Sequence, residues 1–155
     1  MDVTPRERND RCSIARSLQI LGEKWALLVV REAVLGVTRF ADFRARLGIA
    51  PDVLTARLET LVAGGVLERR PYRDAGKRQR DEYVLTDAGW QLQPVLAAFI
   101  AWGDEHRPSG HGPSVVYVEK GTDRPVRLAF LADDGRELHQ DDVTLVSGPG
   151  WLSEG

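Results

Sequence analysis

Apolar side chains recur at helical spacing through the first part of the chain. Ile14, Leu18 and Leu21 are separated by four and three residues, which predicts a short amphipathic helix that ends at Gly22. Residues 24–35 are apolar nearly all round, and a helix with so little polar surface belongs at the centre of a core. The fold is therefore expected to begin with two short helices, the second of them buried.

The next two predicted helices are joined by the turn LGIAPD, residues 47–52. Thr38 is expected to cap the first helix, and Pro51 suits the first turn of the second, which runs to about Ala63. The apolar stripe of the first helix is Phe40, Phe43 and Leu47, while the second buries Leu54, Leu58 and Leu61 and directs Asp52, Thr55, Ala56 and Glu59 outward.

After Gly65 the pattern changes from helical to alternating. Residues 66–73 and 80–86 are typical of two strands, and the connection DAGKRQ predicts a hairpin with a long basic tip. Thr86 and Asp87 are expected to cap one last helix. Its wide apolar stripe would pack on the core or against a second copy of the chain: Leu92, Val95, Leu96, Phe99, Ile100 and Trp102.

The composition changes again after Gly103, where HRPSGHGPS is typical of a linker. The sequence DDG, residues 133–135, predicts a hairpin turn. We therefore expect an α+β chain with a helical and winged part, residues 1–103, and a small β-rich acidic appendage, residues 104–155. The strand candidates of the appendage are Val115–Glu119, Val126–Ala132 and Val143–Val146.

Composition excludes several classes of protein. The chain has 155 residues, 43% of them hydrophobic, but no run of eighteen apolar residues, so no membrane span is expected. The charged start MDVTPRERND does not match a secretory signal, and one cysteine cannot form an intrachain disulfide, which fits a cytoplasmic protein. His106, His111 and His139 lack ligand spacing, so no metal or other cofactor is expected.

Charge is unevenly distributed along the chain. The net charge is only −2, but residues 69–80 hold six bases and one acid, 6 − 1 = +5. Residues 104–155 hold five bases and ten acids, 5 − 10 = −5. Because a partner responds to the local field rather than the sum, the basic hairpin can contact nucleic acid although the whole chain is acidic.

Helix, turn, helix and basic hairpin follow one another in the order of a winged helix-turn-helix. Such a domain places its second helix in the major groove of DNA and its wing on phosphates or the minor groove. A solvated basic hairpin on a domain that binds nothing charged is the alternative, but the order and spacing together favour DNA binding. The expected contacts are Pro51, Asp52, Thr55 and Arg57 from the second helix, Arg39, Arg44 and Arg46 from the supporting helix, and Arg73, Lys77, Arg78 and Arg80 from the hairpin.

The chain resembles the HxlR family of bacterial winged-helix transcription regulators, which are relatives of the MarR regulators. The resemblance covers about residues 11–103 and implies a homodimer, bound to a palindromic operator in double-stranded DNA. It also implies that the first and last helices form the dimer interface through Ile14, Leu18, Leu92, Leu96, Phe99 and Trp102. The features that carry it are Cys12, Gly22-Glu23-Lys24-Trp25, Arg31-Glu32, Arg39-Phe40, Leu47-Gly48-Ile49, Leu54 to Leu58, and Arg80, Glu82, Tyr83, Leu85, Thr86 and Gly89.

Three features depart from the family pattern. Asp52 stands at the front of the recognition helix, where the family usually has a base, and a carboxylate there can cap the helix or accept from cytosine, but it repels phosphate. The wing tip lacks the expected prolines. The appendage resembles a ribbon-like extension of some relatives but has no cysteine pairs, so a zinc site in it is not expected.

The sequence offers two candidate ways in which an effector could control DNA binding. Cys12 is the redox candidate, because a helix start and the neighbouring Arg11 and Arg16 favour a thiolate, while an inert packing cysteine is the alternative. Trp25, Trp90 and Trp102 would line a pocket for a small-molecule effector or simply belong to the core. The leading hypothesis is a homodimeric regulator, more readily a repressor than an activator. The alternative is a protein-interaction module that uses the acidic tail; an enzyme is not expected, since no nucleophile–base pair or phosphate loop is present.

Overall fold

The computed structural model describes residues 9–76 and 78–150. By compactness the chain divides into two units. Among the described residues, the first comprises those up to Leu92 together with Pro149 and Gly150, and the second spans Gln93–Gly148. The division at Leu92 is one of compactness. The predicted end of the DNA-binding and dimerisation domain at residue 103 is a statement about function, and it stays a prediction.

The first unit is built around one central helix. Helix α2 (Ser13–Leu21) and helix α3 (Lys24–Val34) follow the predicted bounds closely. Helix α3 contacts α2, the two helices that come after it and the second wing strand. Its buried residues are Ala26, Val29, Val30, Glu32 and Ala33, so the central position predicted from its apolar surface is confirmed, with one carboxylate inside.

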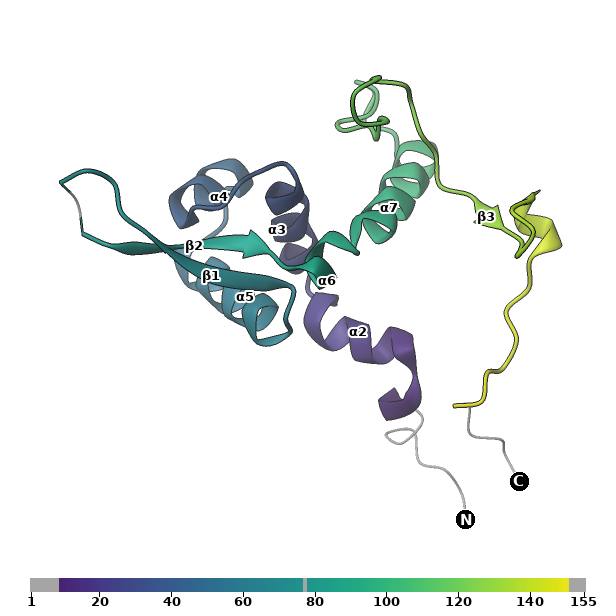
Figure 1. Ribbon diagram of the computed structural model, residues 1–155, viewed down its shortest axis with the longest axis horizontal. Helices are drawn as coiled ribbons and strands as arrows, with labels where there is room; N and C mark the ends of the chain where they lie inside the picture. Colours follow the sequence, from purple (N-terminus) through teal and green to yellow (C-terminus); the bar gives the residue numbers. More distant parts are fainter. Residues whose placement is uncertain (1–8, 77, 151–155) are drawn as a thin grey trace, which may run out of the picture. The chain divides into compact units, whose positions relative to one another are not determined.

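Helices α4 (Phe40–Leu47) and α5 (Pro51–Ala63) form the predicted pair (Figure 1). Thr38 was expected to cap α4, but the cap residue is Arg39. The Thr38 hydroxyl instead donates a hydrogen bond to Glu82 Oε2 at 2.8 Å. The prediction is wrong because Thr38 lies in extended chain that pairs with a strand far along the sequence.

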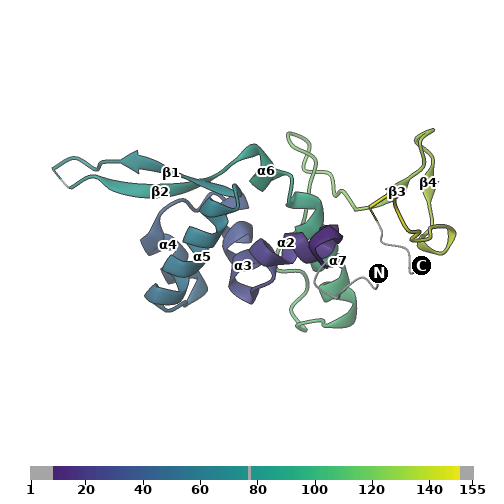
Figure 2. The same cartoon turned by 90° about the horizontal axis from the view of Figure 1, so that it is seen from below.

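Strands β1 (Leu67–Tyr72) and β2 (Arg80–Leu85) form an antiparallel hairpin, in register from Leu67 opposite Leu85 to Tyr72 opposite Arg80. This wing projects past α4 and α5 in both views (Figures 1 and 2). A third segment joins it, because Arg39 bridges to Glu82 and the Tyr83 amide donates to the Thr38 carbonyl at 2.7 Å. The wing is thereby fixed to the start of α4.

The last predicted helix is two helices, α6 (Asp87–Trp90) and α7 (Gln93–His106). Thr86 caps α6 as expected, its hydroxyl oxygen accepting from the Gly89 amide at 3.1 Å. The expectation of one continuous helix is wrong, and Pro94 gives the reason. A proline lacks the amide hydrogen that an unbroken helix needs, and it is tolerated only in a first turn.

The rest of the second unit has little regular structure. Strands β3 (Phe130–Leu131) and β4 (Glu137–Leu138) pair across the predicted turn, where Gly135 has a φ of 82°. A 3-10 turn, η1, covers Gln140–Asp142. Of the expected strands, Val126–Ala132 shrinks to two residues, Val115–Glu119 keeps one bridge between Val118 and Pro125, and Val143–Val146 has no strand. Few side chains here are buried, so little packing supports a longer sheet.

The core of the first unit lies between α3, α4, α5 and the base of the wing. Its largest fully buried side chains are Phe43, Leu54, Leu58, Leu61, Leu67, Val29 and Val30.

No helix in the described part of the chain is long and apolar enough to cross a bilayer.

Candidate nucleic-acid interface

The turn between α4 and α5 sets the direction of the second helix. Gly48 ends α4 with a left-handed φ of 61°, and its amide donates to the Arg44 carbonyl at 3.0 Å. Ile49 is buried in the turn, and Pro51 stands at the start of α5. A side chain at Gly48 would strain this turn, so the glycine fixes where α5 begins.

Helix α5 has a buried and an exposed face, as its sequence predicts. Leu54, Leu58 and Leu61 are wholly buried, which confirms the predicted core face. The exposed face carries Pro51, Asp52, Thr55, Ala56 and Glu59. The structure therefore places the front of α5 in solvent, available to a groove.

Arginines flank this exposed face. Arg57 on α5 is half-buried and Arg44 on α4 is exposed, and neither forms an ion pair with an acid among the described residues. Arg46, which the sequence also offered for phosphate, instead bonds to a buried acid on α3. The supporting helix thus presents fewer phosphate contacts than its sequence suggests.

The wing carries bases of two kinds. Arg69 lies 3.9 Å from Glu59 and Arg70 lies 2.5 Å from Glu68, so these two are neutralised within the fold. Arg78 and Arg80 are exposed and pair with no described acid. Arg73 is also exposed and already engaged in an interaction of its own. Lys77, the remaining predicted wing contact, lies outside the described residues.

Arg39 joins α4 to the wing through its side chain as well as its backbone. Its guanidinium carbon lies 4.3 Å from the centre of the Tyr72 ring, and its Nη2 lies 3.2 Å from Asp74 Oδ1. All three side chains are partly exposed. Arg39 was expected to bind phosphate directly, whereas in this structure an acid of the wing occupies it. Sequence reasoning missed Asp74, because the pair spans 35 positions.

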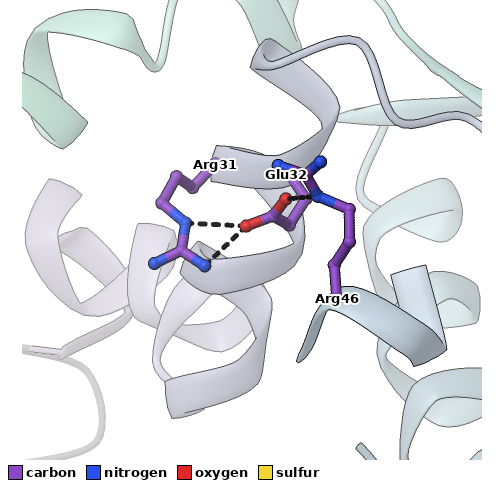
Figure 3. A network of polar contacts seen from close by, with 3 residues as sticks. All are labelled: Arg31, Glu32 and Arg46. Atoms are coloured by element: carbon purple, nitrogen blue, oxygen red, sulfur yellow. Dashed lines mark hydrogen bonds and ion pairs between the residues drawn. The ribbon is translucent and has the colours of Figure 1, made fainter. Parts of the chain in front are cut away.

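A buried carboxylate ties α3 to α4 (Figure 3). Glu32 is only 3% exposed, and its two oxygens accept from different arginines. Arg31 donates to Oε1 through Nε at 3.0 Å and through Nη2, and Arg46 donates to Oε2 through Nε. Burial raises the pKa of Glu32, but the hydrogen bonds and charges of Arg46 and Arg31 outweigh it, so that pKa is lowered below 4.5.

This network holds the end of α3 against the end of α4, next to the turn that precedes α5. Sequence reasoning gave Glu32 no role beyond the family resemblance. The signal was present, because Glu32 is an acid inside an otherwise apolar helix and buried acids require partners. Which arginine meets it could not be read from spacing alone.

Cys12 is the cap residue of α2 and is half-buried. Its amide donates to the Asn9 carbonyl at 3.1 Å and its carbonyl accepts from the Arg16 amide at 3.0 Å. The Arg16 guanidinium, expected beside the thiol, donates to Ser13 Oγ at 3.2 Å. Cys12 is thus partly exposed, and the Arg16 guanidinium, whose charge was expected to favour a thiolate, hydrogen-bonds to Ser13.

The residues expected at the dimer interface divide by exposure. Ile14 and Leu18 on α2 are exposed, and Phe99 and Trp102 on α7 are 60% and 56% exposed. Leu92 is half-buried and Leu96 is buried. Large apolar side chains so open to water need cover, so the first four remain the ones available to a partner.

Ligand sites are few in the described chain. No three His, Cys, Asp or Glu side chains among the described residues are grouped so that they could hold a metal ion. Within the second unit, the Tyr117 hydroxyl donates to the Gln93 carbonyl at 3.3 Å, and burial raises the pKa of Tyr117 above its usual value. This contact ties the appendage to the start of α7.

A family model for HxlR-like helix-turn-helix proteins matches residues 20–111. The HTH-type transcriptional regulator Mb3122 of Mycobacterium bovis, itself uncharacterized, is 37% identical over 144 residues, covering 92% of this chain and 89% of its own. The chain therefore resembles this relative over nearly its full length.

Two solved structures frame the fold. The crystal structure of PA1607, a transcription-factor candidate, matches with a TM-score of 0.75 at 38% identity, covering 88% of this chain and 95% of that one. The redox regulator HypR in its reduced form matches with a TM-score of 0.55 at 29% identity, covering 62% of this chain and 94% of that one.

The two solved structures differ in how much of this chain they match, 88% for PA1607 and 62% for HypR. The family match ends at residue 111, which leaves 155 − 111 = 44 residues beyond it. An alignment over 88% or 92% of the chain must include most of those residues. The appendage is thus shared with the mycobacterial relative and with PA1607.

Proposed function

The chain belongs to the HxlR-like helix-turn-helix family of transcriptional regulators, and from this premise we propose that it is a homodimeric, sequence-specific DNA-binding protein that acts as a repressor. Residues 1–103 are the DNA-binding and dimerisation domain in this proposal. Each subunit inserts the front of α5 into a major groove and lays its wing on the adjacent backbone. Two such helices about 34 Å apart match half-sites one helical turn apart.

One observation carries the DNA-binding proposal: the exposed polar front of α5 lies in the same compact unit as a projecting wing with exposed arginines. Arg78 and Arg80 meet no described acid, so they are available for phosphate. Arg44 and Arg57 add further positive charge near α5. Contacts of this kind position the protein on any duplex, while α5 supplies the choice of sequence.

The test is a binding titration of the full chain on duplex DNA at several salt concentrations. The double variant Arg78→Ala, Arg80→Ala should bind all sequences more weakly. The slope of log K against log salt should fall by about 0.9 for each lost phosphate contact. A charge-matched control, Arg124→Ala with Arg136→Ala in the appendage, should bind as the parent does. Equal binding by all three proteins would refute a DNA-binding wing.

The dimer proposal rests on exposed apolar surface. Leu18 on α2 and Phe99 on α7 are open to water in the single chain, and the family resemblance implies an interface at these helices. Leu18→Ser or Phe99→Ser should yield monomers in sedimentation velocity and weaken operator binding. Leu35→Ser, at an equally exposed leucine after α3, is the control and should leave the mass unchanged. Monomeric parent protein would overturn the proposal.

Cys12 is the residue on which redox control would act. It is partly accessible, and solved structures similar to this chain include the redox regulator HypR. With one cysteine in the sequence, oxidation gives a sulfenic acid, a mixed adduct or a bridge between subunits. If diamide releases DNA from the parent but not from Cys12→Ser, the thiol is the sensor. An equal response of both proteins would leave Cys12 as a packing residue.

A further inference from the structure

Apart from the half-buried Arg57, the front of α5 offers hydrogen-bond acceptors and apolar groups to a partner. The Thr55 hydroxyl donates its hydrogen to the Pro51 carbonyl at 2.8 Å, so its remaining capacity is to accept. Asp52 as a carboxylate has acceptors only. Pro51 and Ala56 add apolar surface. In this structure the Thr55 hydroxyl is used as a donor within its own helix, which leaves its lone pairs for a partner.

Base edges differ in how they meet such a surface. In the major groove cytosine displays an N4 amino donor, thymine a methyl group and guanine only the O6 and N7 acceptors. A carboxylate against guanine therefore sets acceptors against acceptors. Adenine has an N6 amino group but carries the N7 acceptor beside it, whereas cytosine has no acceptor on that edge.

Resting on the proposed DNA binding, we propose that Asp52 is the specificity-determining residue for a cytosine in each half-site, accepting a hydrogen bond from its N4 amino group. The contact is worth about fivefold to tenfold in preference for cytosine over guanine, near the lower end for a base-edge contact.

Glu59 provides the matched control on the same helix. It is also an exposed acid of α5, but its carboxylate lies 3.9 Å from Arg69 on β1. It therefore faces the base of the wing. Two acids of one helix thus have different surroundings, and only the one at the helix front is free to read a base.

The experiment selects bound duplexes from a random-sequence pool with the full chain and its variants, followed by sequencing. The parent should enrich a motif with one cytosine that Asp52→Ala no longer prefers. Asp52→Asn should prefer adenine there, because an amide both donates to N7 and accepts from N6. Glu59→Gln should keep the parent motif. Circular dichroism checks that each variant is folded.

A second measurement changes the DNA rather than the protein. Replacing that cytosine by 2-pyrimidinone deoxynucleoside removes only the N4 amino group. Parent affinity should fall about fivefold to tenfold, while Asp52→Ala should not respond, which isolates the pairwise contact.

The outcomes separate the inference from its premise. One motif shared by the parent, Asp52→Ala and Asp52→Asn, with no loss on 2-pyrimidinone, would overturn the role of Asp52 and leave DNA binding standing. No enriched motif and no salt-dependent binding by the parent would instead overturn the proposed function itself.

Discussion

Replacing Glu32 by glutamine should destabilise the first unit by about 2–4 kcal/mol at neutral pH. Three N–H donors from two arginines converge on this carboxylate, which is 3% exposed. A hydrogen bond to a charged group contributes about 1.5–3 kcal/mol when buried. The Arg31 and Arg46 side chains are 34% and 53% exposed, so water replaces part of what they lose and the sum is reduced by roughly half.

The loss should depend on pH in one direction. The folded-state pKa of Glu32 lies below its unfolded value, so its contribution is complete above about pH 4.5 and disappears as pH falls through the folded pKa. Glutamine does not titrate. The gap in unfolding free energy between the parent and Glu32→Gln should therefore be widest near neutrality and shrink in acid.

Urea unfolding followed by circular dichroism, repeated from neutral pH to about pH 3, measures both quantities. Glu59→Gln is the control, since the same substitution there removes an exposed pair at 3.9 Å and should cost less than about 0.5 kcal/mol. A loss at Glu32 as small as at Glu59, or a gap that does not change with pH, would refute the reasoning about the buried network.

Three further substitutions test the wing, its attachment and a glycine of α7. Asp74→Asn should release Arg39 for phosphate, tightening DNA binding several-fold and steepening its salt dependence by up to about 0.9 per subunit; unchanged affinity would mean that Arg39 stays on the wing. Gly89→Ala should destabilise by about 1–3 kcal/mol in thermal unfolding, because the new Cβ would lie 2.3 Å from the Val66 carbonyl oxygen. Gly103→Ala, in open space within α7, should instead stabilise by up to about 1 kcal/mol, and equal effects at both glycines would refute the close-approach argument.

Features set by local periodicity were predictable from the sequence. The two faces of α5 follow from leucines spaced along one side, and the central position of α3 follows from its apolar surface. The left-handed turn before α5 was marked by Gly48 and Pro51. Each of these depends on residues within a few positions of one another, which is the range that a pattern describes.

Features that depend on distant pairs were not predictable. Thr38 lies 44 positions from Glu82, and a threonine before a helix reads as a cap unless that strand is known to pass beside it. Asp74 and Arg39 are a similar case at the wing. The strand predictions for the appendage were wrong for a different reason. Alternating residues form strands only where a neighbouring strand and a packed face exist, and few side chains of the appendage are buried.

The surface proposed to face DNA contains acids as well as bases, and the two kinds of charge would have different effects on binding. Arg78 and Arg80 attract any duplex, because phosphate carries no sequence information. In the proposed complex, Asp52 would repel the same phosphates and stabilise only a complex in which an amino group of a base meets it. Asp74 withholds Arg39 until a phosphate competes for it. In this proposal Asp52 lowers the affinity for random DNA more than for a site with the matching base, whereas Asp74 lowers the affinity for all sequences alike. A regulator competes against a large excess of random sites, so the ratio of the two affinities is what the Asp52 carboxylate would raise.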